Sequence, residues 1–180
     1  MSHIDDSPVI RASVWICPTG EALDSIQHVI HRVHRRGAGP HLRPHVTLLS
    51  GIERTLASAE VCLKHLAARI KPFVVELGRI ESREDYFRSL YATVSLSPEL
   101  AAAQREAHEV FEMNPPVPYE PHLSLLYGNI GADLQKTLAA EAGGSVDVSF
   151  TATALQLVNA SASVPVTAWK VLSERSLASR

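Results

Sequence analysis

Two short segments of the sequence each carry a histidine that is followed two residues later by a hydroxyl residue. The segments are Arg43-Pro-His-Val-Thr-Leu-Leu-Ser-Gly51 and Glu120-Pro-His-Leu-Ser-Leu-Leu-Tyr-Gly128. They are identical at five of nine positions. Side chains at i and i+2 of a strand share a face, so His45 points with Thr47 and His122 points with Ser124. The alternate residues are then expected to point into the apolar interior: Val46, Leu48, Leu123 and Leu125. The repeat therefore predicts two equivalent strands, related by an approximate two-fold axis, that place two imidazoles and two hydroxyls around one cleft.

These four groups, His45, Thr47, His122 and Ser124, suit in-line attack on a phosphodiester. One imidazole takes a proton from water and the other gives a proton to the leaving oxygen, near neutral pH. The two hydroxyls can donate to the non-bridging oxygens, where negative charge develops. Acidic residues that Mg²⁺ would require do not cluster near either motif. We therefore expect hydrolysis that uses no metal and no other cofactor.

Hydrophobic periodicity predicts the elements that position these groups. The expected strands are 9–17, 44–50, 73–80, 86–96, 119–127, 146–150, 154–159 and 168–172, and the expected helices are 21–36, 56–70, one that begins at Pro98, and 133–141. Breaks are expected at 37–40 and at the proline-rich run 114–118. No linker divides the chain, so we expect a single domain over residues 1–180, with a polar tail at 173–180 that frays.

Composition narrows the class of partner. The 180 residues are 46% hydrophobic and 20% charged, with a net charge of −2, so no basic field exists to hold a nucleic acid stably. A small phosphorylated ligand fits this balance better. No apolar run reaches membrane-spanning length and no signal peptide is recognisable. Cys17 and Cys62 lack metal-ligand spacing. We expect a monomeric, cytoplasmic protein without a membrane or stable nucleic-acid partner.

The duplicated His-x-Thr/Ser motif resembles the 2H phosphoesterase superfamily. The longer string from Pro118 to Gly128 resembles its cyclic nucleotide phosphodiesterase branch, known from plants and yeasts. The resemblance implies an α+β fold of two pseudo-symmetric, intertwined lobes, each an antiparallel sheet with helices on its outer face, around a central cleft. It also implies hydrolysis of ADP-ribose 1″,2″-cyclic phosphate to ADP-ribose 1″-phosphate, and of nucleoside 2′,3′-cyclic phosphates to 2′-phosphates. The cysteines that pair in some plant members are not evident here.

Five further residues are candidates for substrate binding. Tyr127 matches a tyrosine of that branch, but alternation places it in the cleft only if its strand ends or turns at the following glycine. Arg43 lies two residues before the first histidine and could bind a phosphate or pyrophosphate, or could be a solvated loop residue. Tyr86 and Phe87 begin the strand expected opposite the first motif, where an aromatic ring could stack on a base or simply pack. Trp169 has the same two interpretations.

The remaining histidines have simpler expected roles. His28, His31 and His34 are spaced i, i+3 and i+6, which rotates them around a helix, so a solvated face is favoured over a zinc site. The unrepeated histidines are expected at the surface or in loops: His3, His41, His65 and His108. Ser50, which occupies the Tyr127 position in the first segment, is a weaker candidate for the cleft.

Two other functions stay open alongside hydrolysis of small cyclic phosphates. The first is an RNA 2′,3′-cyclic phosphodiesterase or a 2′,5′ RNA ligase-like enzyme, which the absence of a basic stripe disfavours. The second is a non-catalytic nucleotide-binding 2H module. Loss of a histidine or hydroxyl from one segment would mark such a module, and both segments keep both groups.

Overall fold

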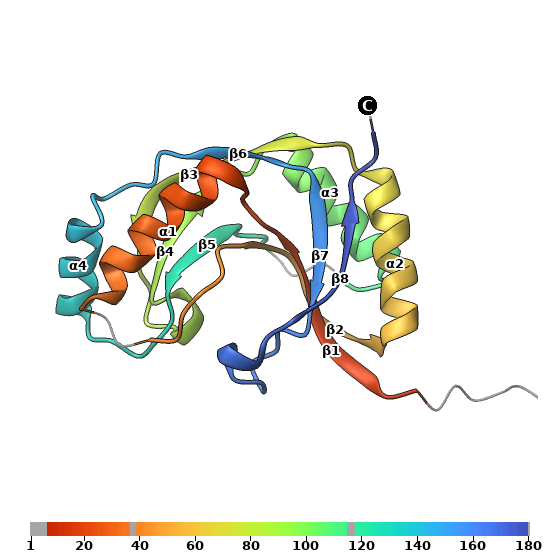
Figure 1. Ribbon diagram of the computed structural model, residues 1–180, viewed down its shortest axis with the longest axis horizontal. Coiled ribbons are helices and arrows are strands. Elements are labelled where there is room, and N and C mark those ends of the chain that lie inside the picture. Colours follow the sequence, from red (N-terminus) through yellow and green to blue (C-terminus); the bar gives the residue numbers. More distant parts are fainter. Residues whose placement is uncertain (1–6, 37–38, 115–117, 180) are drawn as a thin grey trace, which may run out of the picture.

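The computed structural model describes residues 7–36, 39–114 and 118–179 (Figure 1). The strands are β1 (Val9–Ile16), β2 (Val46–Thr55), β3 (Phe73–Glu81), β4 (Leu90–Val94), β5 (His122–Leu126), β6 (Ser149–Ala152), β7 (Ala154–Val158) and β8 (Val171–Ser176). The helices are α1 (Gly20–His34), α2 (Leu56–Arg69), α3 (Pro98–Val110) and α4 (Ala132–Glu141), with two short 3₁₀ turns, η1 (Tyr86–Arg88) and η2 (Val166–Ala168). His3 and parts of the two expected breaks, 37–38 and 115–117, lie outside the described residues.

The strands form one curled antiparallel sheet in the order β6-β3-β4-β5-β2-β1-β7-β8. This confirms the expected α+β fold with antiparallel strands. The two strands that carry the motifs, β2 and β5, are neighbours at the centre of the sheet and pair at Val46 and Leu123. Each motif strand therefore sits at the inner edge of its own four-stranded half.

Each half contains a strand-helix-strand unit, β1-α1-β2 in one and β4-α3-β5 in the other. The helices of these units pack across the middle of the molecule. Helix α1 contacts β5 of the opposite half and α4, while α3 contacts β2 of the opposite half and α2 (Figure 1). Because each half supplies a helix that covers the other, the relative position of β2 and β5 is held from both sides.

Local sequence signals account for where the helices begin. Ser97 accepts a hydrogen bond from the backbone N–H of Leu100, and Pro98 occupies the first turn of α3, where no N–H is needed. Thr55 caps α2 in the same way through the N–H of Ser58. The helix boundaries near Gly20, Leu56, Pro98 and Ala132 thus agree with the predicted ones to within one residue.

The two motif strands bury their alternate residues as predicted. Val46 and Leu48 are at most 1% exposed, and Leu123 and Leu125 are fully buried. Strand β2 extends to Thr55, beyond its predicted end, because Gly51 adopts a φ of +77° and forms a bulge opposite β1. The polar residues of the motifs lie on the opposite face of β2 and β5 from these buried residues.

The structure corrects the predicted strand at 86–96. Tyr86–Arg88 is a 3₁₀ turn, because the Asp85 carboxylate accepts from the N–H of Phe87 and the Asp85 carbonyl accepts from that of Arg88. Strand β4 begins only at Leu90. It pairs with β5, the strand of the second motif, so the prediction that this segment lies opposite the first motif was wrong.

Four further predictions need correction. The predicted last strand, 168–172, is displaced to Val171–Ser176. The tail, predicted to fray, is ordered as far as Ala178: β8 pairs with β7, and the N–H of Ala178 donates to carbonyls at the end of α2. The sixth strand is Ser149–Ala152, three residues later than predicted, where it pairs with β3. His108 is not a surface residue; it is buried, with Nδ1 hydrogen-bonded to the Met113 carbonyl.

Candidate active site

A pocket of about 710 Å³ brings the two motifs together. Its lining includes His45 and Thr47 from the first motif and its strand β2, and His122 and Ser124 from β5. Phe87, Tyr127, Trp169 and Ser50 also line it. The volume lies within the range of small-ligand sites. Residues separated by more than seventy positions in the sequence therefore face one cavity, as the repeat predicts.

Both motif histidines are held by the same main-chain contact. Nδ1 of His45 lies 2.7 Å from the carbonyl oxygen of Arg43, and Nδ1 of His122 lies 3.0 Å from that of Glu120. A carbonyl oxygen can only accept, so each Nδ1 carries the hydrogen. Each Nε2 is then the atom that can take up or release a proton. The geometry gives the two imidazoles equivalent tautomers.

An aromatic ring supports each of these imidazoles from the adjoining outer strand. Trp15 on β1 stacks on His45 with ring centroids 3.5 Å apart and planes 9° apart. Tyr91 on β4 meets His122 edge to face at 5.5 Å. Neither ring was predicted from the sequence. The sequence does hold a signal for them: Trp15 precedes His45 by thirty residues and Tyr91 precedes His122 by thirty-one, so an aromatic residue recurs at nearly the same distance before each motif histidine.

Burial controls the protonation of the pair. Desolvation lowers the pKa of His45 to about 4, and the nearby charge of His122 adds to this effect. Desolvation also lowers the pKa of His122, which is only half-buried. Both imidazoles are therefore neutral at pH 7. An anionic phosphate placed between them favours the protonated form of one imidazole.

The hydroxyls of the two motifs differ in their contacts. Ser124 donates to the carbonyl of Phe87 at 2.9 Å, and its side chain also interacts with that of Tyr127. Burial raises the pKa of Tyr127 to about 12, so its phenol stays protonated and can donate. The Thr47 side chain has no hydrogen-bond partner among the described residues. Thr47 is thus the hydroxyl that is free to bind a ligand directly.

One wall of the pocket is aromatic. The rings of Phe87 and Trp169 are nearly parallel, 18° apart, with centroids at 6.2 Å. Tyr127 presents an edge to both, and it reaches the pocket because β5 ends one residue earlier, at Leu126. Tyr86 is different: it packs against Phe87 and Tyr127 but is 38% exposed and does not line the pocket.

Arginines also reach this region, though not all as expected. Arg43 does not line the main pocket; it lies at a neighbouring cavity of about 340 Å³ that shares His45 and Trp169 with it. Arg11 and Arg88, which were not predicted from the sequence, do line the main pocket. Each is ion-paired with a glutamate, Arg11 with Glu53 and Arg88 with Glu120.

The other histidines do not assemble into a metal site. In the part of the chain that the structure describes, no three His, Cys, Asp or Glu side chains are grouped closely enough to hold a metal ion. His34 departs from the predicted solvated face: it is half-buried and stacks against His41 with centroids 5.7 Å apart. None of the described helices is both long and apolar enough to cross a membrane.

The sequence matches a protein family model, and the fold is similar to that of several solved structures. Residues 17–163, which include both motifs, match the family model described as the 2′-5′ RNA ligase superfamily. The chain is 24% identical over 130 residues to a cyclic phosphodiesterase of Arabidopsis thaliana, which covers 72% of each protein. Among solved structures, E. coli LigT complexed with 3′-AMP aligns with a TM-score of 0.62 and 18% identity, over 96% of this chain and 100% of that one. TT0787 of Thermus thermophilus aligns with a TM-score of 0.65 and 18% identity, over 93% and 98%.

Proposed function

The chain belongs to the 2′-5′ RNA ligase superfamily of 2H phosphoesterases, and from that premise we propose that it is a hydrolase that opens cyclic phosphodiesters. The observation that carries the proposal is the equivalent placement of His45 and His122 in one pocket. Each has Nδ1 held by a carbonyl and Nε2 left for proton transfer. Core packing does not require two histidines that each present a free Nε2 to one pocket, whereas acid-base catalysis needs a ring nitrogen of each histidine within reach of the substrate.

The proposed reaction needs one imidazole in each protonation state. The Nε2 of one histidine removes a proton from water as the water oxygen forms a bond to phosphorus. The bond from phosphorus to one ribose oxygen breaks, and that oxygen receives a proton from Nε2 of the other histidine. The product is an open phosphomonoester. Thr47, together with the Ser124–Tyr127 hydroxyl pair, supports the proposal as a source of donors for the non-bridging oxygens.

The proposed substrates are nucleoside 2′,3′-cyclic phosphates and ADP-ribose 1″,2″-cyclic phosphate. The pocket volume and the aromatic wall of Phe87, Tyr127 and Trp169 support a ligand with a base or sugar beside its phosphate. Stacking of a base on such rings contributes about 1–3 kcal/mol. A relative bears the name cyclic phosphodiesterase, and E. coli LigT has been solved with 3′-AMP, a single nucleotide.

A second candidate is an RNA 2′,3′-cyclic phosphodiesterase or a 2′,5′ RNA ligase-like enzyme. The family name and the likeness to LigT favour it. Against it stands the net charge of −2, which supplies no overall basic field for a polynucleotide backbone. Assaying a cyclic-phosphate-ended RNA beside the two small substrates separates the candidates. A cytoplasmic, monomeric enzyme stays a prediction.

The deciding experiment is turnover of a nucleoside 2′,3′-cyclic phosphate in EDTA. We expect the 2′-phosphate as product, and a fall in kcat of ~10²–10⁴ when either His45 or His122 is replaced by Ala, with folding retained. His65→Ala, at an exposed position on α2, is the matched control. Binding without turnover would instead support a nucleotide-binding module, and activity restored only by a divalent cation would contradict the metal-free scheme.

A further inference from the structure

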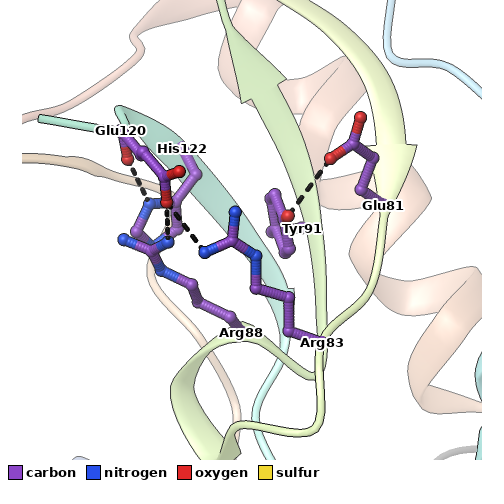
Figure 2. A network of polar contacts seen from close by, with 6 residues as sticks. All are labelled: Glu81, Arg83, Arg88, Tyr91, Glu120 and His122. Atoms are coloured by element: carbon purple, nitrogen blue, oxygen red, sulfur yellow. Dashed lines mark hydrogen bonds and ion pairs between the residues drawn. The ribbon is translucent and has the colours of Figure 1, made fainter. Parts of the chain in front are cut away.

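Two arginines converge on one carboxylate beside the second motif histidine (Figure 2). Arg83, in the turn after β3, and Arg88, in η1, both donate to the same oxygen of Glu120, at 2.7 and 2.8 Å. The Arg83 guanidinium also lies over the ring of Tyr91, 5.9 Å from its centre. Both guanidiniums are therefore oriented toward one point, which an anion occupies.

That point lies next to the proposed reaction centre. Arg88 lines the main pocket together with His122, and the main-chain carbonyl of Glu120 is the group that holds Nδ1 of His122.

The carboxylate at this point can leave easily. Glu120 and Arg83 are each 46% exposed, so their ion pair lies in water, and solvent screening keeps such a pair weak. A phosphate carries more charge and more acceptor oxygens than the single carboxylate oxygen used here, and it can take a bidentate bond from a guanidinium. The two carboxylates that line the main pocket stay engaged, Asp85 with the N–H of Phe87 and Glu53 with Arg11.

We propose that Arg83 and Arg88 form a subsite for a second phosphate group of the substrate, and that the Glu120 carboxylate fills this subsite in the free enzyme. The inference rests on the proposed function, since it takes the cyclic phosphate to lie between His45 and His122. Within the proposed substrate class, it predicts a preference for nucleotides whose cyclic phosphate is accompanied by a 5′-phosphate or a pyrophosphate. Such a ligand displaces Glu120 into solvent and binds both guanidiniums.

A binding measurement tests this without relying on turnover. Calorimetry compares the Kd of adenosine 2′-phosphate with that of adenosine 2′,5′-bisphosphate for the intact protein and its variants. One charge-assisted contact at a partly exposed site corresponds to a preference of about tenfold for the bisphosphate. We expect Arg83→Gln and Arg88→Gln to abolish this preference and Glu120→Gln to increase it. Glu141→Gln, which removes the acidic partner of Arg36 in another exposed pair, is the matched control and should leave it unchanged.

Several results would overturn the inference. A bisphosphate preference that is the same in all five proteins, or that Glu120→Gln reduces, would show that the arginines do not hold a substrate phosphate. Inorganic phosphate binding that Arg88→Gln weakens, with no bisphosphate preference, would assign the arginines to a free anion instead. The proposed function fails separately: a protein that prefers the bisphosphate but hydrolyses no cyclic phosphate keeps the subsite and loses the reaction.

Discussion

The burial of His45 predicts a loss of stability in mild acid that this one side chain causes. His45 is 8% exposed, and burial lowers its pKa from 6.5 to about 4. As the pH falls below 6.5, the unfolded chain binds a proton at His45 while the folded protein does not. The free energy of unfolding therefore falls with pH between these two values, and the contribution is fully present only above 6.5. At about 1.36 kcal/mol per pKa unit, the whole effect is about 3 kcal/mol.

The measurement is urea unfolding at about pH 7.5 and about pH 4.5, for the wild type and for His45→Asn. Asparagine keeps an N–H that can donate to the Arg43 carbonyl but cannot be protonated. We expect the wild type to lose about 2.5 kcal/mol more than the variant between the two conditions. His65→Asn, at an exposed site, should behave as the wild type does. Equal losses in wild type and His45→Asn would refute the argument that burial keeps His45 neutral.

Three further predictions concern the pH dependence of the rate, the loop before the first motif and the aromatic wall of the pocket. Because burial lowers the pKa of both His45 and His122, the state in which only one of them is protonated should be most populated below pH 6.5. We therefore expect kcat/KM to peak below pH 6.5, and a maximum above pH 7 would contradict this. Gly39→Ala would place a Cβ 2.5 Å from the Tyr127 carbonyl oxygen, so we expect the free energy of unfolding, measured in urea, to fall by about 1–3 kcal/mol. Gly131→Ala, with open space around the new Cβ, is the control, and equal losses in the two variants would count against the clash. Phe87→Ala should raise the KM for a nucleoside 2′,3′-cyclic phosphate about tenfold with little change in kcat. Tyr86→Ala, outside the pocket, should raise this KM less, and a larger increase for Tyr86→Ala than for Phe87→Ala would argue against stacking on Phe87.

Local physics let the sequence determine the motif strands and most of the helices. Alternation along a strand is a property of the backbone, so the repeat alone predicted which side chains share the cleft and that Val46 and Leu123 turn inward. Helix starts were equally local, as at Pro98, where Ser97 caps the N-terminus. Since these signals lie within a few residues of each other, no tertiary contact was needed to interpret them.

Other features depended on partners distant in the chain. Trp15 stacks on His45 only because β1 pairs with β2, and β8 is ordered only because β7 offers it an edge. Phe87 faces the pocket through a 3₁₀ turn that an aspartate side chain closes against the strand propensity of the segment. Neither pairing nor turn could be inferred from periodicity, which reports burial but not the identity of the neighbour.

The chemistry of the site divides in the same way. The residue types and their spacing determined that two histidines and two hydroxyls meet in one cleft, because each motif is a contiguous stretch of strand. Only the tertiary structure decided that both Nδ1 atoms are held by carbonyls, that burial keeps His45 neutral, and that Arg88 reaches the same pocket. Tautomer, pKa and the direction of a long side chain all depend on what surrounds the group in space, and strands brought together from across the chain supply those surroundings.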